Sequence, residues 1–200
     1  MAVSATGDLG LRAGDALIVV DLQNDFLPGG SLGVPHGDEV VQVLGECVRR
    51  FLARGLPVLA TRDWHPVDHC SFRAQGGPWP PHCIAGTAGA EFARDLWLPP
   101  AVGVVSKATE RDREAYSAFA GTDLAQRLRR AGCKRLFVGG LATEYCVLST
   151  VRDAIGEGLA VVVLLDAVRA VNVQEDDGAR ALAQMSALGA RMAVFEELPE

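Results

Sequence analysis

Residues 61–72 read TRDWHPVDHCSF and hold two histidines, two aspartates and a cysteine. The whole chain has only four histidines, and three of them, His65, His69 and His82, lie in or just after this stretch. Imidazole nitrogens and carboxylate oxygens are ligands of zinc, iron and manganese. We therefore expect one divalent transition metal here, with zinc first and iron or manganese as alternatives. Ordinary hydrogen-bonded loop histidines are the competing interpretation.

The spacing of these residues fits an open metal site. Asp63 and His65 are two positions apart, which places both side chains on one side of an extended segment. His69 and His82 follow and can each supply a further ligand. Three protein ligands leave coordination positions for water or substrate, unlike a closed structural site. No paired C-x-x-C occurs, which excludes a zinc finger.

Cys146 is the second residue that could do chemistry. Gly139 and Gly140 end an apolar run, Thr143 is a residue type that caps helices, and Cys146 then falls in the first helical turn. Backbone N–H groups at a helix start favour a thiolate and can bind an oxyanion. Most free cysteines are instead buried and inert. That second interpretation is kept for Cys47 and Cys133, while Cys70 and Cys83 stay undecided.

A cysteine nucleophile needs a base, and no histidine lies near a strand end on its side. Asp21 ends an apolar run, and a partly buried carboxylate can have a raised pKa and shuttle protons. Lys107, one of only two lysines, ends another run and would offset that charge. Ligands bind outside the carboxyl ends of α/β strands, where the strand order reverses. If strands 16–21 and 135–140 are neighbours there, these groups share one crevice with Cys146.

Short apolar, β-branched runs alternate with helical patterns along the chain, which is typical of βα units and a parallel sheet. We expect an α/β fold, a doubly wound, mostly parallel six-stranded sheet with helices on both faces. Asp166 ends one run, and we interpret it as the start of a solvated loop. The expected strands are 16–21, 57–63, 102–107, 135–140, 160–166 and 191–195, and the expected helices are 38–54, 122–131, 143–157 and 175–188.

Length and composition predict one globular domain over residues 15–200, after a flexible tail at 1–14. The net charge of −6 argues against nucleic acid or an anionic membrane as partner. No apolar stretch reaches the roughly 18 residues of a membrane span, and no signal peptide is visible, so a cytoplasmic location is expected. Five cysteines without framework spacing predict free thiols. A homo-oligomer is neither demanded nor excluded.

The segment from 63 to about 100 shows no clear helix or strand. A loop of that length is usually functional or disordered, and its tryptophans and histidines argue against disorder. Its glycines would permit closure over a bound molecule, so residues 66–100 could act as a lid. The sequence leaves that question open.

Five stretches then match one family in the same order along roughly residues 15–195. They are ALIVVDLQNDFLPGGSLGVP (16–35), DWHPVDHCSF (63–72), WPPHCIAGTAGAEF (79–92), SKATERDREAYSAF (106–119) and GGLATEYCV (139–147). Through them the chain resembles the nicotinamidase branch of the isochorismatase-like cysteine hydrolases. The resemblance implies hydrolysis of nicotinamide, and also of pyrazinamide, to the acid and ammonia through a thioester.

The resemblance also implies residue roles. The family's catalytic triad falls on Asp21, Lys107 and Cys146. Its oxyanion-hole amides fall on Ala142 and Cys146, with a cis peptide bond expected between Leu141 and Ala142. The metal ligands fall on Asp63, His65 and His82, with His69 beside them rather than on the metal. The residues expected around the substrate ring are Phe26, Trp79, Tyr116 and Leu141.

Two alternatives stay open from the sequence. A carbamoyl or ureido amidohydrolase of the same superfamily shares the triad but generally lacks the metal motif, so bound metal and an aromatic pocket would discriminate. A non-catalytic metal-binding domain on the same fold is the other, since a fold does not fix a function. Retention of all three triad residues argues against the latter.

Overall fold

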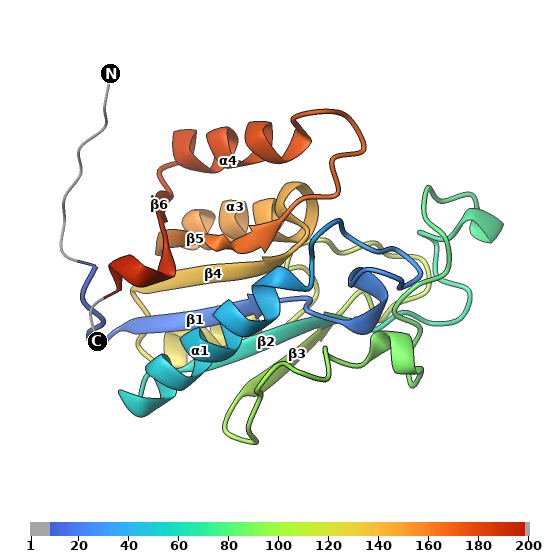
Figure 1. The fold of residues 1–200 in the computed structure, drawn as a ribbon. Helices are drawn as coiled ribbons and strands as arrows, with labels where there is room; N and C mark the ends of the chain where they lie inside the picture. Colours follow the sequence, from blue (N-terminus) through green and yellow to red (C-terminus); the bar gives the residue numbers. More distant parts are fainter. Residues whose placement is uncertain (1–8, 199–200) are drawn as a thin grey trace.

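The structure, a computed structural model, describes residues 9–198 and contains one six-stranded sheet (Figure 1). All its strand pairs are parallel, and the strand order is β3-β2-β1-β4-β5-β6. The predicted doubly wound α/β fold is confirmed. The strands are β1 (Asp15–Val20), β2 (Val58–Asp63), β3 (Gly103–Lys107), β4 (Arg135–Leu141), β5 (Ala160–Arg169) and β6 (Arg191–Ala193).

Helices cover both faces of the sheet, and this explains why the strands are almost continuously apolar. Leu17 and Val19 of β1 pack into one core, whereas Ile18 and Val20 pack into the other. Helix α1 lies on the first face and the other three helices lie on the second (Figure 1). The helices are α1 (Glu39–Ala53), α2 (Leu124–Arg130), α3 (Leu148–Gly156) and α4 (Asp177–Ala187).

The strand order reverses between β1 and β4, as the sequence analysis required for a shared crevice. These two strands approach closely where Val20 pairs with Gly140. A side chain at Gly140 would place its Cβ only 2.0 Å from the carbonyl oxygen of Val20, and its φ of +134° is one that only glycine adopts freely. The glycine therefore allows the end of β4 to lie directly beside the end of β1.

Two local predictions are wrong. The helix expected over 143–157 is present, as a π-helical turn, Thr143–Val147, followed by α3, but its N-cap is Ala142 and not Thr143. Strand β5 continues past Asp166, so this residue does not begin a loop. Its carboxylate oxygens accept hydrogen bonds of 3.0 and 2.9 Å from the backbone N–H of Phe195. Asp166 thus anchors the C-terminal segment to the sheet.

The predicted flexible tail, 1–14, lies only in part within the described residues. Residues 1–8 lie outside the described part, but Leu9 is buried and Leu11 packs against the core. The carbonyl of Gly10 accepts a 2.7 Å hydrogen bond from Arg135, which also forms a buried ion pair with Asp15. The segment just before residue 15 therefore packs on the core, and the domain boundary expected at residue 15 stays a prediction.

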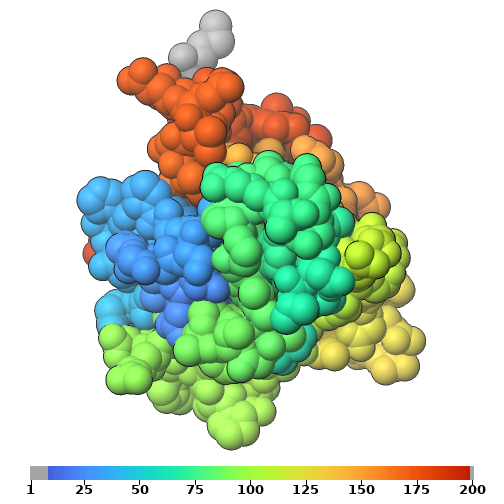
Figure 2. Space-filling model, turned by 90° about the vertical axis from the view of Figure 1, so that its right-hand side faces the viewer, coloured from blue at the N-terminus to red at the C-terminus, as the bar shows by residue number. Residues whose placement is uncertain are grey.

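The segment between β2 and β3 carries two short 3-10 helices, Arg73–Gln75 and Ala88–Ala90. Isolated β-bridges tie it to itself and to the residues after β1. Figure 2 views the end of the molecule where the strands finish, and this segment, in green, covers much of it beside the blue residues that follow β1. Within residues 9–198, no helix combines the length and apolar character needed to cross a membrane. All five cysteines are free, as predicted.

Candidate active site

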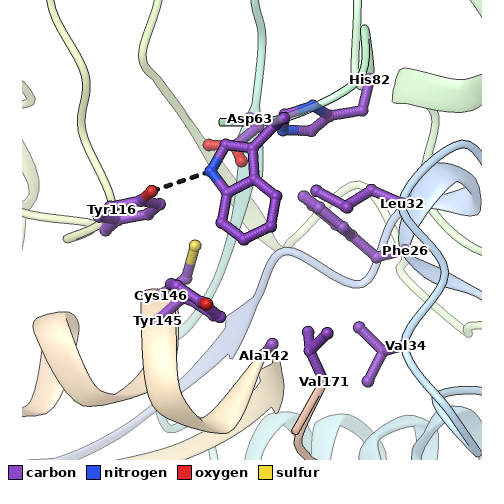
Figure 3. Close-up of a pocket in the computed structure, with 11 residues that line it drawn as sticks. Phe26, Leu32, Val34, Asp63, His82, Tyr116, Ala142, Tyr145, Cys146 and Val171 are labelled. Atoms are coloured by element: carbon purple, nitrogen blue, oxygen red, sulfur yellow. Dashed lines mark hydrogen bonds between the residues drawn. The ribbon is translucent and has the colours of Figure 1, made fainter. Parts of the chain in front are cut away.

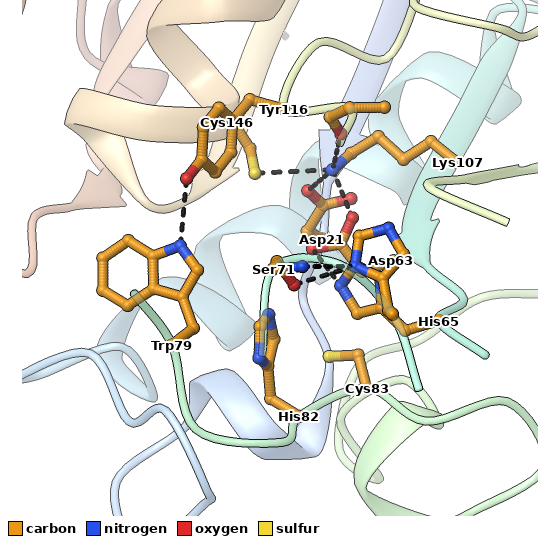
Figure 4. A network of polar contacts seen from close by, with 12 residues as sticks. Asp21, Asp63, His65, Ser71, Trp79, His82, Cys83, Lys107, Tyr116 and Cys146 are labelled. Carbon is orange, nitrogen blue, oxygen red and sulfur yellow. Dashed lines mark hydrogen bonds and ion pairs between the residues drawn. The ribbon is translucent and has the colours of Figure 1, made fainter. Parts of the chain in front are cut away.

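Three side chains from separate strand ends meet in one crevice, where the ammonium group of Lys107 contacts the other two (Figure 4). Asp21 directly follows β1, Lys107 ends β3, and Cys146 lies in the turn after β4. The Nζ atom of Lys107 is 3.0 Å from Oδ2 of Asp21 and 3.4 Å from Sγ of Cys146. All three residues are buried. The sequence-based expectation that they share one crevice is confirmed, whereas their catalytic roles stay predictions.

Lys107 also binds a second carboxylate. Asp63 is its register partner on β2, and Nζ lies 2.5 Å from Oδ1 of Asp63 and 3.1 Å from the carbonyl oxygen of Ala115. Burial by itself would lower the pKa of Lys107, but Asp21 and Asp63 outweigh it and raise that pKa well above the ordinary value. The ammonium is therefore a fixed positive charge between two carboxylates.

Asp21 is held in a form suited to accept a proton. Burial raises the pKa of its carboxyl above the ordinary value; Lys107 opposes this rise and Asp63 adds to it. The Oγ1 hydroxyl of Thr61 donates a 2.6 Å hydrogen bond to Oδ1. The backbone of Asp21 has a φ of 48°, in the left-handed region that aspartate tolerates better than most residues. The chain thus turns sharply just after β1 and directs this carboxylate into the crevice.

Burial and charged neighbours both act on the pKa of the Cys146 thiol. Burial raises its pKa well above the ordinary value, Lys107 opposes this, and the charges of Asp21 and Asp63 add to it. Burial and the two carboxylates thus act against the expectation that the start of the helix favours a thiolate. A carboxylate oxygen of Asp21 lies within 4.8 Å of Sγ, close to where a departing proton would go.

Asp63, His65 and His82 form a cluster whose potential ligand atoms lie within 4.8 Å of one another. Neither ring nitrogen of His65 has a hydrogen-bond partner among residues 9–198, although the side chain is buried. Buried polar atoms without a partner are rare in folded proteins and point to a missing ligand. The arrangement of these three side chains fits a divalent transition metal.

His82, which belongs to this cluster, and His69, which lies beside it, differ in whether a ring nitrogen is free. The Nδ1 atom of His82 is 2.8 Å from the carbonyl oxygen of Pro80, which can only accept, so Nδ1 carries the proton and Nε2 keeps a lone pair. Burial lowers the pKa of His82 and keeps the ring neutral. His69 instead donates from Nε2 to the carbonyl of Arg113, and its Nδ1 accepts from Ser71. His69 therefore has no nitrogen left for a metal.

Asp63 connects the cluster to Lys107. One carboxylate oxygen contacts Lys107, and the other lies 3.7 Å from Nε2 of His65. Burial opposes ionisation, but Lys107 and His65 together hold the pKa of Asp63 well below its usual range. Asp63 is thus a charged group. Its carboxylate belongs to the candidate metal site and also contacts Lys107, which lies beside Cys146.

Gln23 holds the backbone of Asp63 in place, and sequence reasoning missed it. Its side-chain Oε1 accepts a 2.7 Å hydrogen bond from the N–H of Asp63, and its Nε2 donates to the carbonyls of Asp63 at 2.8 Å and Ala90 at 2.9 Å. The amide is fully buried and pairs with Asp63 much as a neighbouring strand would. The signal available in the sequence was a glutamine only two residues after Asp21, close to the end of an apolar run.

Replacing Gln23 with leucine should lower the free energy of unfolding by about 2–5 kcal/mol, because it leaves three buried backbone groups without partners. Urea unfolding measures this loss. Gln126→Leu, at an exposed position of α2, is the matched control and should change stability by no more than about 0.5 kcal/mol. A Gln23→Leu variant as stable as that control would contradict the anchoring role.

A pocket that is partly open to solvent lies above these groups (Figure 3). Cys146 directs its sulfur into the pocket, and Asp63 and His82 lie at one end. Phe26, Trp79 and Tyr116 line it, and the indole N–H of Trp79 donates a 2.9 Å hydrogen bond to the Tyr116 hydroxyl. A space walled by aromatic rings fits a small flat ligand.

The remaining pocket wall was not predicted from the sequence. Tyr145, next to the nucleophile candidate, packs its ring edge-on against Trp79 with ring centroids 5.2 Å apart. Its position directly before Cys146 in the sequence was a signal that could have identified it. Nothing in the local sequence marks the aliphatic residues that line the pocket. That lining consists of Leu32, Val34 and Val171, beside Ala142, which the resemblance had placed in the site.

The Leu141 prediction needs correction. Its side chain is fully buried in the core on the α1 face and is not part of the pocket lining. The alternation of side chains along a strand explains this, since the end of β4 directs Leu141 away from the crevice. The peptide bond between Leu141 and Ala142 is cis, as predicted.

Comparison with known proteins identifies the family of this chain. A family model for the isochorismatase domain matches residues 15–197. The chain belongs to the isochorismatase family. A nicotinamidase of Escherichia coli is 38% identical, over 92% of this chain and 97% of that protein.

Solved structures that are similar to this chain carry related names. A pyrazinamidase of Pyrococcus horikoshii in complex with zinc is 49% identical and superimposes with a TM-score of 0.87, covering 90% of this chain and 99% of that one. PnC1 of L. infantum in complex with nicotinate is 35% identical, with a TM-score of 0.86 and coverage of 94% and 96%. These three relatives are thus named as a nicotinamidase, a pyrazinamidase and a protein in complex with nicotinate.

Proposed function

We propose that this protein is a nicotinamidase that converts nicotinamide to nicotinic acid and ammonia and also hydrolyses pyrazinamide. The observation that carries the proposal is the position of one thiol. Cys146 lies within contact of a buried lysine and beside a carboxylate, at the floor of an aromatic-walled pocket. The similarity to nicotinamidases and pyrazinamidases over most of the chain supports the choice of substrate.

In the proposed first half-reaction, Asp21 takes the thiol proton while the sulfur of Cys146 attacks the carboxamide carbon. Lys107 stabilises the thiolate as it forms, because its charge lies 3.4 Å from the sulfur. The backbone N–H groups of Ala142 and Cys146 are assigned to the carbonyl oxygen as it gains negative charge. The C–N bond then breaks, and ammonia leaves with the proton that Asp21 received.

In the second half-reaction, Asp21 takes a proton from a water molecule, whose oxygen attacks the thioester carbon. The C–S bond breaks, nicotinic acid is released, and Cys146 regains its proton. Asp21 therefore acts as base and acid in turn. Its raised pKa suits the base steps, because such a carboxylate takes up a proton more readily than a surface aspartate does.

Asp63, His65 and His82 are proposed to hold the metal, and zinc is favoured because the Pyrococcus horikoshii relative is in complex with it. When bound, the metal supplies a coordination position for the ring nitrogen of the substrate. Phe26, Trp79 and Tyr116 are proposed to enclose the ring. Ring orientation by these groups would direct the carboxamide toward Cys146. An amidohydrolase for carbamoyl substrates would use neither the aromatic wall nor the metal cluster.

The test of this function is ammonia release by the purified protein from nicotinamide, pyrazinamide and an N-carbamoyl amino acid. We expect turnover of the two aromatic amides and none of the carbamoyl compound. The reverse order of preference would overturn the proposal in favour of the carbamoyl amidohydrolase.

Removal of the metal should weaken substrate binding at least as much as it slows chemistry. With a chelator, KM for nicotinamide is expected to rise at least about tenfold, equivalent to ~1.4 kcal/mol, and zinc should restore it. Steady-state kinetics on the stripped and reconstituted protein measure the change, with metal content determined in parallel. An unchanged KM in metal-free protein would contradict the role given to the cluster.

A further inference from the structure

The side chain of Thr61 is fully buried and contacts Asp21 twice. Its hydroxyl donates a 2.6 Å hydrogen bond to Oδ1 of Asp21 and accepts a 3.2 Å hydrogen bond from the Asp21 backbone N–H. That N–H also lies 3.2 Å from the carbonyl oxygen of Thr61. A hydroxyl has one proton, so the proton of Thr61 is committed to Oδ1.

This contact distinguishes the two oxygens of Asp21. Oδ1 is occupied by the Thr61 hydroxyl, whereas Oδ2 lies 3.0 Å from Nζ of Lys107 and has no hydrogen-bond partner that meets standard geometry among residues 9–198. A carboxylate group otherwise rotates easily, because its terminal torsion has a broad, two-fold preference. Thr61 therefore restricts which oxygen faces the crevice.

We propose that Thr61 is a positioning residue for the base: its hydroxyl fixes the Asp21 carboxylate so that Oδ2 receives the proton from Cys146. Thr61 touches neither the sulfur nor the pocket, and it acts through Asp21 alone. The inference rests on the proposed function, which it deepens by naming the reacting oxygen and the group that selects it. Asp21 has a left-handed backbone, and Thr61 holds both the backbone N–H and the side chain of that residue.

Two substitutions separate positioning from simple packing. Thr61→Val keeps the shape of the side chain and loses the hydroxyl, whereas Thr61→Ser keeps the hydroxyl and loses a methyl group. We expect kcat to fall about 10²-fold in the valine variant, with KM for nicotinamide unchanged and zinc content intact. The serine variant should retain most of the wild-type kcat. Thr150→Val is the matched control, since Thr150 is equally buried and accepts a hydrogen bond from Ala118 away from Asp21.

A second measurement does not depend on the substrate. Iodoacetamide, itself a small carboxamide, alkylates Cys146 only after the thiol proton has left. Mass spectrometry of the Cys146 peptide should show slower alkylation in Thr61→Val than in wild type and Thr61→Ser. A wild type that releases no ammonia but keeps this order would refute the proposed function and leave the positioning role standing.

The positioning role itself is overturned by either of two results. One is a folded Thr61→Val protein with wild-type kcat and alkylation rate. The other is a Thr61→Ser protein as impaired as Thr61→Val, since that outcome would mean that the methyl group, and hence packing, matters. If Thr150→Val loses as much activity as Thr61→Val, the effect is general to buried threonines and the role is likewise rejected.

Discussion

Cys146→Ala is expected to abolish ammonia release, with a fall in kcat of about 10⁴-fold or more. The sulfur forms the covalent bond to the substrate in the proposed reaction, and an alanine methyl group cannot replace it. The fold should survive, because the substitution removes one atom from a buried position and costs on the order of 1 kcal/mol. Zinc binding should also survive, since the Asp63, His65 and His82 cluster does not include the sulfur.

Cys47→Ala is the matched control for this experiment. Cys47 is equally buried, but it lies in α1, which packs on the opposite face of the sheet from α3. This control should keep wild-type kcat at a similar cost in stability. Thermal unfolding and metal analysis of both variants show whether each is folded and loaded. Substantial turnover by a folded, zinc-loaded Cys146→Ala protein would remove the cysteine from the mechanism.

Lys107→Met should lower the free energy of unfolding by about 3–5 kcal/mol and also eliminate activity. Methionine fills a similar volume but carries no charge. Its introduction would leave the buried carboxylates of Asp21 and Asp63 without the ammonium that lies 3.0 and 2.5 Å from them. Two unpaired negative charges in a buried site repel each other, and one of them would have to take up a proton.

Urea unfolding of Lys107→Met, with metal content measured alongside, tests this expectation. Lys134→Met, at the exposed position of the other lysine, serves as control and should be within about 0.5 kcal/mol of wild type. Adding Asp21→Asn to Lys107→Met should restore part of the lost stability, because one unpaired charge is removed. A Lys107→Met protein as stable as the Lys134→Met control would show that the buried ammonium does not hold the site together.

The sequence predicted the sheet and the meeting of three side chains for a simple physical reason. Parallel strands covered on both faces are continuous apolar runs, and the polar residues that end them gather at one edge of the sheet. Asp21, Asp63 and Lys107 each stand at such an end, so their convergence follows from strand order alone. The alternation of strand and helix patterns predicted a parallel sheet, whereas the strand order comes from the structure.

Features that depend on three-dimensional packing could not be predicted in this way. The aliphatic part of the pocket comes from Leu32, Val34 and Val171, which lie on loops far apart in the sequence. The extension of β5 past Asp166 depends on a partner strand and on a backbone N–H from the C-terminal segment. The raised pKa of Cys146 follows from its burial, whereas a helix-start argument alone gives the opposite direction.

The burial that raises the pKa of Cys146 also bears on how the protein endures oxidising conditions. Peroxide attacks thiolates far faster than thiols, so a sulfur that ionises only during turnover is a poor target between turnovers. The pKa of each of the other four cysteines is likewise raised, with burial as the main cause. We therefore expect the five free thiols to resist oxidation to sulfenic acid. Cys146 should be most vulnerable during turnover.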